Sequence, residues 1–232
     1  MKSIRLIAVG VLFAVTLGSL PVKAAPIQIA SRAALAGNDF FDWAALGAQF
    51  STPPNPFVLA SDSGAVQLTG SNPDGGGLRL LNDTDIGFPA GAGRILEAGV
   101  DNDFTTNFAK LSFLFDTPVQ GVGLEINVAI GGGGTQEAQL TLFDSSNTII
   151  GTFTTGAVGL LSDPFLGALD GAATISRADF VIIDPLPVGR RFAVTTLDFV
   201  LDAGASVPEP GALAVFGFGL AGLVFARRCK RA

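Results

Sequence analysis

Residues 119–130 read VQGVGLEINVAI, and this stretch decides the fold class. Apolar side chains stand at every second position, namely Val122, Leu124, Ile126, Val128 and Ile130. The positions between them hold Gly121, Gly123, Glu125, Asn127 and Ala129. Such alternation is the pattern of a strand whose successive side chains point to opposite faces. The stretch therefore predicts a β-strand with one buried face.

The segments that follow repeat the pattern. Four glycines at 131–134 and the turn-forming DSSN at 144–147 separate EAQLTLF (137–143) and TIIGTFTT (148–155) from the first strand and from each other. Links this short cannot cross over a sheet, so we expect an antiparallel meander. Ala138, Leu140 and Leu142 are predicted to point inward.

Strand-like segments also occur on both sides of this meander. KLSFLF (110–115) alternates Leu111, Phe113 and Phe115, and shorter candidates are PFVLAS (56–61), AVQLTG (65–70) and GLRLLN (77–82). Later in the chain, ADFVIID (178–184) is one expected strand and RFAVTTLDFVLD (191–202) is another. The last has one face made of Ala193, Thr195, Leu197, Phe199 and Leu201. Short strands separated by frequent turns predict an all-β fold, an antiparallel two-sheet β-sandwich over residues 25–206.

The N-terminal residues 1–24 have the three parts of a secretory signal peptide. Lys2 and Arg5 form its charged start, and a mostly apolar run from Ile4 to Leu20 would form a signal helix. Small residues precede a predicted cleavage between Ala24 and Ala25. A retained anchor is the alternative, but the apolar run is short for a spanning helix.

The C-terminal residues 207–232 contain a second apolar segment. Val207, Pro208, Glu209 and Pro210 introduce it, and residues 212–226 carry no charge. Fifteen helical residues reach only ~22 Å, and a helix this short can span a bilayer when the bilayer thins locally. The segment ends in the basic residues Arg227, Arg228, Lys230 and Arg231, which favour the cytoplasmic side. We therefore expect a transmembrane helix at 212–226, with the body outside the inner membrane.

This tail resembles the PEP-CTERM sorting signal of Gram-negative bacteria. The resemblance implies recognition by an exosortase, cleavage near Pro208-Glu209-Pro210, and release or transfer to the cell envelope or extracellular matrix. A plain C-terminal anchor is the alternative. The body also resembles jelly-roll domains that are common in PEP-CTERM proteins, through Asp39, Trp43, Leu46 and Gly47 at its opening and Asp198 near its close. This second resemblance implies a jelly-roll-like sandwich.

Charge excludes one class of partner. Residues 25–207 hold seven basic and nineteen acidic residues, so their formal net charge is −12 (seven minus nineteen). A negative field of this size repels phosphate backbones and disfavours nucleic acid. Cys229 is the one cysteine of the chain, so the exported body has no disulfide available.

Candidate catalytic residues are few. The chain has no histidine and no tyrosine, which removes the commonest general base. Lys110 and Ser112 share a strand face as a conceivable lysine–serine pair, and Asp101 and Asp103 as a carboxylate pair. The first pair is better explained as a lysine at the rim of the sheet beside a strand serine. The second pair is better explained as a solvated turn. We therefore expect no catalytic residue, no metal ligand and no cofactor, with a structural calcium at Asn82, Asp83 and Asp85 or at 101–103 as the alternative.

Two further residue patterns bear on ligands. Trp43 is the single tryptophan, and in sandwiches such a residue is more often a core anchor than a sugar-stacking platform. Thr152 and Thr154 share one face, but one such rung is an ordinary strand edge rather than an ice-binding ladder. We expect a non-enzymatic, structural or weakly ligand-binding protein of the envelope or the exopolysaccharide matrix. Its expected partners are an exosortase, the membrane before processing, and polysaccharide. A carbohydrate-binding module is the alternative, followed by an ice-binding protein or a glycoside hydrolase.

Overall fold

The computed structural model describes residues 24–85, 93–99, 110–129, 136–158, 163–183 and 191–202. The sorting motif Val207–Pro210, the predicted transmembrane helix at 212–226, the basic residues after it and most of the signal peptide lie outside these residues. None of the helices in the described part of the chain has the length and hydropathy that a membrane crossing requires. Residues 24–202 form one unit, to which all that follows refers.

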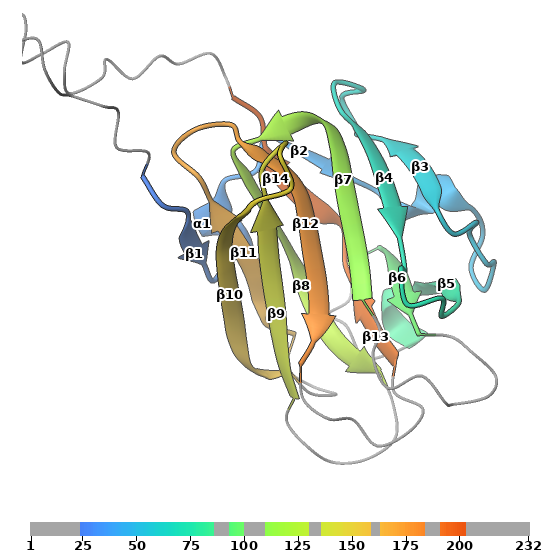
Figure 1. Ribbon diagram of the computed structural model, residues 1–232. Helices are drawn as coiled ribbons and strands as arrows, with labels where there is room; N and C mark the ends of the chain where they lie inside the picture. Colours follow the sequence, from blue (N-terminus) through green and yellow to red (C-terminus); the bar gives the residue numbers. More distant parts are fainter. Residues whose placement is uncertain are drawn as a thin grey trace, which may run out of the picture. The chain divides into compact units, whose positions relative to one another are not determined.

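Two antiparallel sheets make up the described residues, and Figure 1 shows β10, β9, β12 and β7 side by side in one of them. The six-stranded sheet runs β10 (Ile149–Val158), β9 (Gln136–Phe143), β12 (Ile175–Ile182), β7 (Lys110–Val119), β4 (Gln67–Ser71) and β3 (Phe57–Ala60). The eight-stranded sheet runs β1 (Ile27–Ile29), β11 (Phe165–Leu169), β8 (Gly121–Ala129), β13 (Arg191–Val194), β6 (Arg94–Ala98) and β5 (Leu78–Asn82). Its two remaining strands are β14 (Leu197–Val200), which pairs with β8, and β2 (Asp39–Phe41), which pairs with β14. The predicted all-β, two-sheet antiparallel sandwich is confirmed.

Short helical segments connect some of these strands. They are the α-helix α1 (Arg32–Leu35) and the 3-10 helices η1 (Trp43–Leu46) and η2 (Asp83–Asp85). Ser31 caps α1 by accepting a hydrogen bond from the amide of Ala34, and Asp42 caps η1 in the same way through Ala44. The strands β1, β2, β6 and β11 and these helical segments had no counterpart among the sequence predictions.

The core lies between the two sheets and follows the predicted alternation. The inward residues of β7 and β9 are all buried, namely Leu111, Phe113, Phe115, Ala138, Leu140 and Leu142. Leu68 of β4 and Phe180 of β12 join them in one hydrophobic cluster with the inward side chains of the other sheet. The predicted inward faces of β7 and β9 are therefore correct, whereas at 191–194 the side chains in the core are Phe192 and Val194 rather than the predicted Ala193.

The strand at 119–130 differs from its prediction because both of its faces are covered. Val122, Leu124 and Ile126 are buried in the core as expected. Gly121, Gly123 and Asn127 are also buried. A Cβ added to Gly123 would lie 2.4 Å from the ring of Phe165, which shows how closely a neighbouring side chain packs over the outer face. The prediction of a single buried face is wrong for β8.

A second small hydrophobic cluster explains this burial. Ile29, Leu35 and Phe165 form it, and Leu169 and Val200 pack against it. Ile29 and Leu35 come from β1 and α1, Phe165 and Leu169 from β11, and Val200 from β14, so the N-terminal segment of the body packs on the outer face of the eight-stranded sheet. Glycines at β8 leave the room that these side chains fill.

The predicted meander is only half correct. β9 and β10 do form an antiparallel hairpin, with Thr152 opposite Thr141. β8, however, pairs with β11, β13 and β14, whereas β9 pairs with β10 and β12 in the other sheet. In a sandwich, a short link can pass from one sheet to the other instead of joining neighbours within one sheet. β7 and β8 show this directly, because Gln120 alone separates them.

The predicted single strand at 191–202 is two strands, β13 and β14, interrupted at Thr195 and Thr196. The backbone carbonyl of Thr195 accepts a 2.7 Å hydrogen bond from the indole Nε1 of Trp43. The indole therefore occupies a backbone acceptor at the break. The chain stays paired with β8 on one side, while its partner on the other side changes from β6 to β2.

Candidate functional site

The sequence-predicted site residues fall into two groups. The sorting residues Val207, Pro208, Glu209 and Pro210 lie outside the described residues. Ala24 and Ala25 are exposed ahead of β1. The remaining candidates belong to the body and are placed by the structure.

The opening and closing segments of the body meet in the eight-stranded sheet. β2 pairs with β14 so that Asp39 lies opposite Phe199. Trp43 is fully buried and stacks on Phe113 with ring centroids 5.6 Å apart, which confirms that it is a core residue. It is not available to stack on a sugar.

Asp39 has a structural task in this opening segment. Its carboxylate accepts hydrogen bonds from the hydroxyl and the backbone amide of Ser63 and from the amide of Phe40. Burial opposes ionisation, but hydrogen bonds from Ser63, Ser61 and the backbone outweigh it and lower the pKa of Asp39. The carboxylate therefore holds the turn between β3 and β4.

The structure brings Lys110 and Ser112 together around Asp179, on the outer face of the six-stranded sheet. The Lys110 Nζ lies 2.7 Å from one carboxylate oxygen of Asp179, and the Ser112 hydroxyl donates to the other oxygen at 2.7 Å. The ammonium is thus paired with a carboxylate and is not placed to take a proton from the serine. This geometry favours an ion-pair cluster over a lysine–serine nucleophile.

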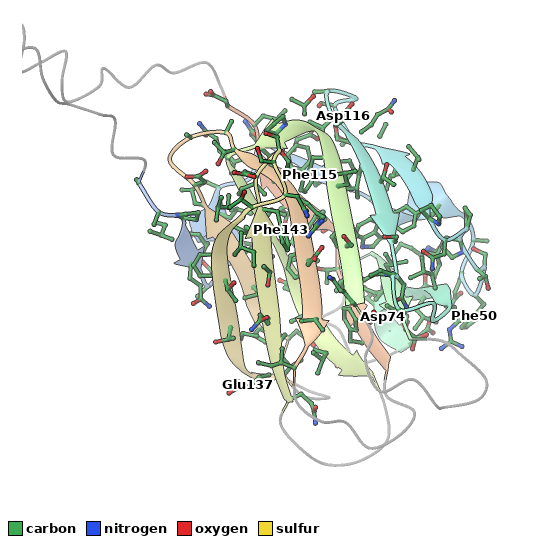
Figure 2. All side chains as sticks on the ribbon, viewed as in Figure 1. Phe50, Asp74, Phe115, Asp116, Glu137 and Phe143 are labelled. Carbon is green, nitrogen blue, oxygen red and sulfur yellow. The ribbon has the colours of Figure 1, made fainter. Side chains whose placement is uncertain are left out.

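Arg177 completes this cluster and was not singled out from the sequence. Its Nε lies 3.3 Å from the Asp179 carboxylate, and its guanidinium carbon lies 3.6 Å from the centre of the Phe143 ring. Figure 2 shows Phe143 near one end of β9 and Glu137 near the other. A signal was present in the sequence, because Asp179 interrupts the otherwise apolar run 178–183 and Arg177 directly precedes that run. The partner strands were needed to identify the contacts of both residues.

Strand register arranges the outer face of this sheet into two parallel rows. Cross-strand pairing places one row, called here the apolar row, at Val58, Thr69, Leu114, Arg177, Phe143 and Ile149. The adjacent row, called here the hydroxyl row, consists of Ser71, Ser112, Asp179, Thr141 and Thr152. Both rows run across the strands rather than along them.

A second polar cluster lies on the outer face of the eight-stranded sheet. Arg32 of α1 contacts Asp198 at 2.6 Å, approaches Glu125 at 3.7 Å, and donates to the hydroxyls of Thr195 and Thr196. Burial raises the pKa of Asp198 to about 6, with Arg32 lowering it and Glu125 raising it further. Arg32 therefore joins the N-terminal segment to the last strand.

Asp163 extends this second cluster. It accepts a hydrogen bond from the side-chain amide of Asn127, which is fully buried. Burial raises the pKa of Asp163, with the Asn127 hydrogen bond lowering it and the charge of Glu125 raising it. Sequence reasoning missed this cluster, because its members are far apart in the chain and only the sheet brings them together.

The calcium candidates occupy the turn at η2. Asp85 accepts hydrogen bonds from the amide of Asn82 and from the Gln49 side chain, and Arg94 donates to the Asn82 side-chain oxygen at 2.7 Å. An arginine at this position favours a hydrogen-bonded turn over a cation site. Asp101 and Asp103 lie outside the described residues, and within the described ranges no three Asp, Glu, His or Cys side chains gather as a metal cluster.

Fold and tail together define an exported β-sandwich with a C-terminal sorting signal. Residues 206–231 match the family model of the PEP-CTERM protein-sorting motif, which confirms the predicted resemblance of the tail. This signal implies export and sorting to the cell envelope. No curated protein matches the chain.

Solved structures resemble the body at low sequence identity. The K2 cleaved adhesin domain of Lys-gingipain shares 11% identity, with 71% of this chain and 99% of that chain covered and a TM-score of 0.44. TmCBM61 in complex with beta-1,4-galactotriose shares 8% identity, with 60% and 89% covered and a TM-score of 0.38. CsCBM6-3 from Clostridium stercorarium in complex with cellobiose shares 15% identity, with 57% and 86% covered and a TM-score of 0.31.

Proposed function

We propose that the protein is a non-enzymatic component of the cell envelope or the exopolysaccharide matrix, delivered there through its sorting signal. The match of residues 206–231 to the sorting motif is the observation that carries this proposal. In it, an exosortase cuts near Pro208-Glu209-Pro210, because proline disfavours a helix and a processing enzyme binds an extended segment. Before processing, the apolar segment 212–226 anchors the protein in the inner membrane.

The chemistry of the body supports a structural role. The chain contains no histidine or tyrosine, and Lys110, its candidate base, is paired with Asp179. Trp43, Asp39 and Arg32 are all engaged in holding segments of the fold together. We propose a jelly-roll-like sandwich that serves as a stable module rather than as a catalyst.

Mass spectrometry of the protein from fractionated cells tests the processing. We expect a mature N-terminus at Ala25, a C-terminus close to Pro208–Pro210, and recovery in the envelope or matrix fraction. A variant with Pro208, Glu209 and Pro210 all replaced by alanine should keep its tail and stay in the inner membrane, whereas the neighbouring Ser206→Ala should be processed normally. An intact chain of 232 residues in the cytosol would contradict the proposal.

A carbohydrate-binding module is the second candidate, and the paired rows on the outer face of the six-stranded sheet favour it. Binding and structural roles are separated by screening the purified protein on a glycan array. Saturable binding favours the module, and silence favours the purely structural role. Turnover of any arrayed glycan would contradict both.

A further inference from the structure

We propose that the outer face of the six-stranded sheet binds a neutral polysaccharide chain that lies across the strands. This inference rests on the proposed function, because a matrix protein meets polysaccharide at high concentration. The ligand's polysaccharide chain crosses the strands of this face, and the face binds neutral chains in preference to acidic ones.

The apolar row exposes large apolar side chains to solvent. Val58 is 65% exposed, Leu114 50% and Ile149 60%, and these are three of the exposed large apolar residues of the described chain. Strand register places all three in one row with Phe143, across β3, β4, β7, β12, β9 and β10. Single exposed apolar residues need no explanation, but three that strand register aligns in one row, with Thr69 and Arg177 between them, form a surface that an elongated ligand can contact.

The hydroxyl row supplies the complementary chemistry. Along β4, β7, β12 and β9 it lies two residues from the apolar row, on the same face, and along β10 it lies three residues away because the register shifts after Ile149. The Ser112 hydroxyl donates to Asp179, while those of Thr141 and Thr152 have no side-chain partner within the described ranges. A pyranose ring presents C–H groups on its face and hydroxyls at its rim, so it can satisfy both rows at once. Strands repeat every ~4.8 Å, close to the length of one hexopyranose unit, so successive sugars meet successive strands.

Charge selects a neutral chain. Among the residues that the structure describes on this face, the cations Lys110 and Arg177 both lie against Asp179, so these residues offer no unpaired block of positive charge to an acidic polymer. The field of the body is strongly negative, at a formal −12 for residues 25–207. Acidic polysaccharides are therefore repelled on approach, whereas neutral chains are not.

A second copy of this chain fits the face less well. Two identical faces pressed together would bury both hydroxyl rows, and hydroxyls buried without partners destabilise an interface. A glycan brings its own hydroxyls and bridging water to those positions. Self-association is therefore an outcome that the experiment must separate from glycan binding.

Affinity electrophoresis of the exported, processed protein tests the inference. Gels containing hydroxyethyl cellulose, glucomannan, galactomannan, dextran or the neutral polysaccharide of the producing cells are compared with gels containing alginate. We expect retardation by at least one neutral polysaccharide and none by alginate. Leu114→Ser combined with Ile149→Ser should weaken that binding by about tenfold or more, because each substitution removes the apolar side-chain surface that would be buried against the sugar.

Ile27→Ser is the matched control. Ile27 is 58% exposed, nearly the same as Ile149, but it lies in β1 of the other sheet, so its variant should bind within about twofold of the wild type. The inference is overturned if no neutral gel retards the protein, if alginate retards it equally, or if the double variant binds like the control. It is also overturned if sedimentation shows that the double variant abolishes a dimer instead. The termini found by mass spectrometry test the proposed function independently of all these outcomes.

Discussion

Replacing Asp198 with asparagine should change how the stability of the body depends on pH. Asp198 is 9% exposed and lies on β14, paired with Arg32 and close to Glu125. Burial raises its pKa to about 6 in the folded protein, from a usual value of 3.8. Between these two values, the folded protein holds a proton that the unfolded chain has already released.

The sign follows from proton linkage. Where the folded state binds more protons than the unfolded state, the free energy of unfolding falls as the pH rises. A tenfold change in an ionisation constant corresponds to 1.36 kcal/mol, so this carboxyl should lower stability by up to ~3 kcal/mol between pH 4 and pH 7. Asp163, whose pKa burial also raises, acts in the same direction. Asp39 acts oppositely, because its lowered pKa adds stability that is lost only as the pH falls below about 4.

Urea unfolding of wild-type protein and Asp198→Asn at several pH values between 4 and 7.5 measures the effect. The difference in unfolding free energy between the two proteins should change by about 2–3 kcal/mol across this range, in favour of the variant at high pH. Asp74→Asn, an exposed aspartate in the turn after β4 that Figure 2 labels, is the control and should leave a constant difference. If the Asp198→Asn and wild-type curves run parallel, the assigned burial of this carboxyl is incorrect.

Three further predictions concern the core and a buried ion pair. Gly70→Ala should destabilise the body by about 1–3 kcal/mol, because the added Cβ would lie 2.1 Å from the buried ring of Phe57. The control is Gly156→Ala, whose Cβ would meet no atom within 4 Å and should leave the stability unchanged. Thermal melting of the two variants and the wild type measures the difference. Trp43 should show blue-shifted fluorescence that acrylamide quenches weakly, since the residue is fully buried, and strong quenching would contradict its core position. Glu97→Gln should cost about 2 kcal/mol in urea unfolding, since it leaves a part-buried arginine without its 2.7 Å carboxylate partner; an unchanged midpoint would refute this.

Local pattern predicted most of the strands that alternate cleanly. The segments at 56–61, 65–70, 77–82, 110–115 and 137–143 all became strands, because alternating apolar residues have one stable solution, a half-buried sheet. Strands with short or glycine-rich sequences, such as Phe165–Leu169, escaped notice because their burial depends on neighbours rather than on their own period.

The candidate site was only partly accessible to such reasoning. Lys110 and Ser112 were visible as a pair, since they lie two positions apart and therefore share one strand face. Their actual partner, Asp179, lies 67 residues from Ser112 in the chain, and only the pairing of β12 with β7 brings it there. The same is true of Arg32 and Asp198, which join the two ends of the body.

What the sequence alone determined is the class and the destination of the protein. Apolar alternation specifies strands with a buried face. An apolar segment between Pro-Glu-Pro and a basic end specifies a sorting signal. Both patterns can be recognised in the sequence because they depend on residues that are near neighbours in the chain. Only the tertiary structure decided which sheet each strand joins, which strand is buried on both of its faces, and which side chains align in rows across the six-stranded sheet. These properties depend on strand register, and register is set by contacts between residues far apart in the chain.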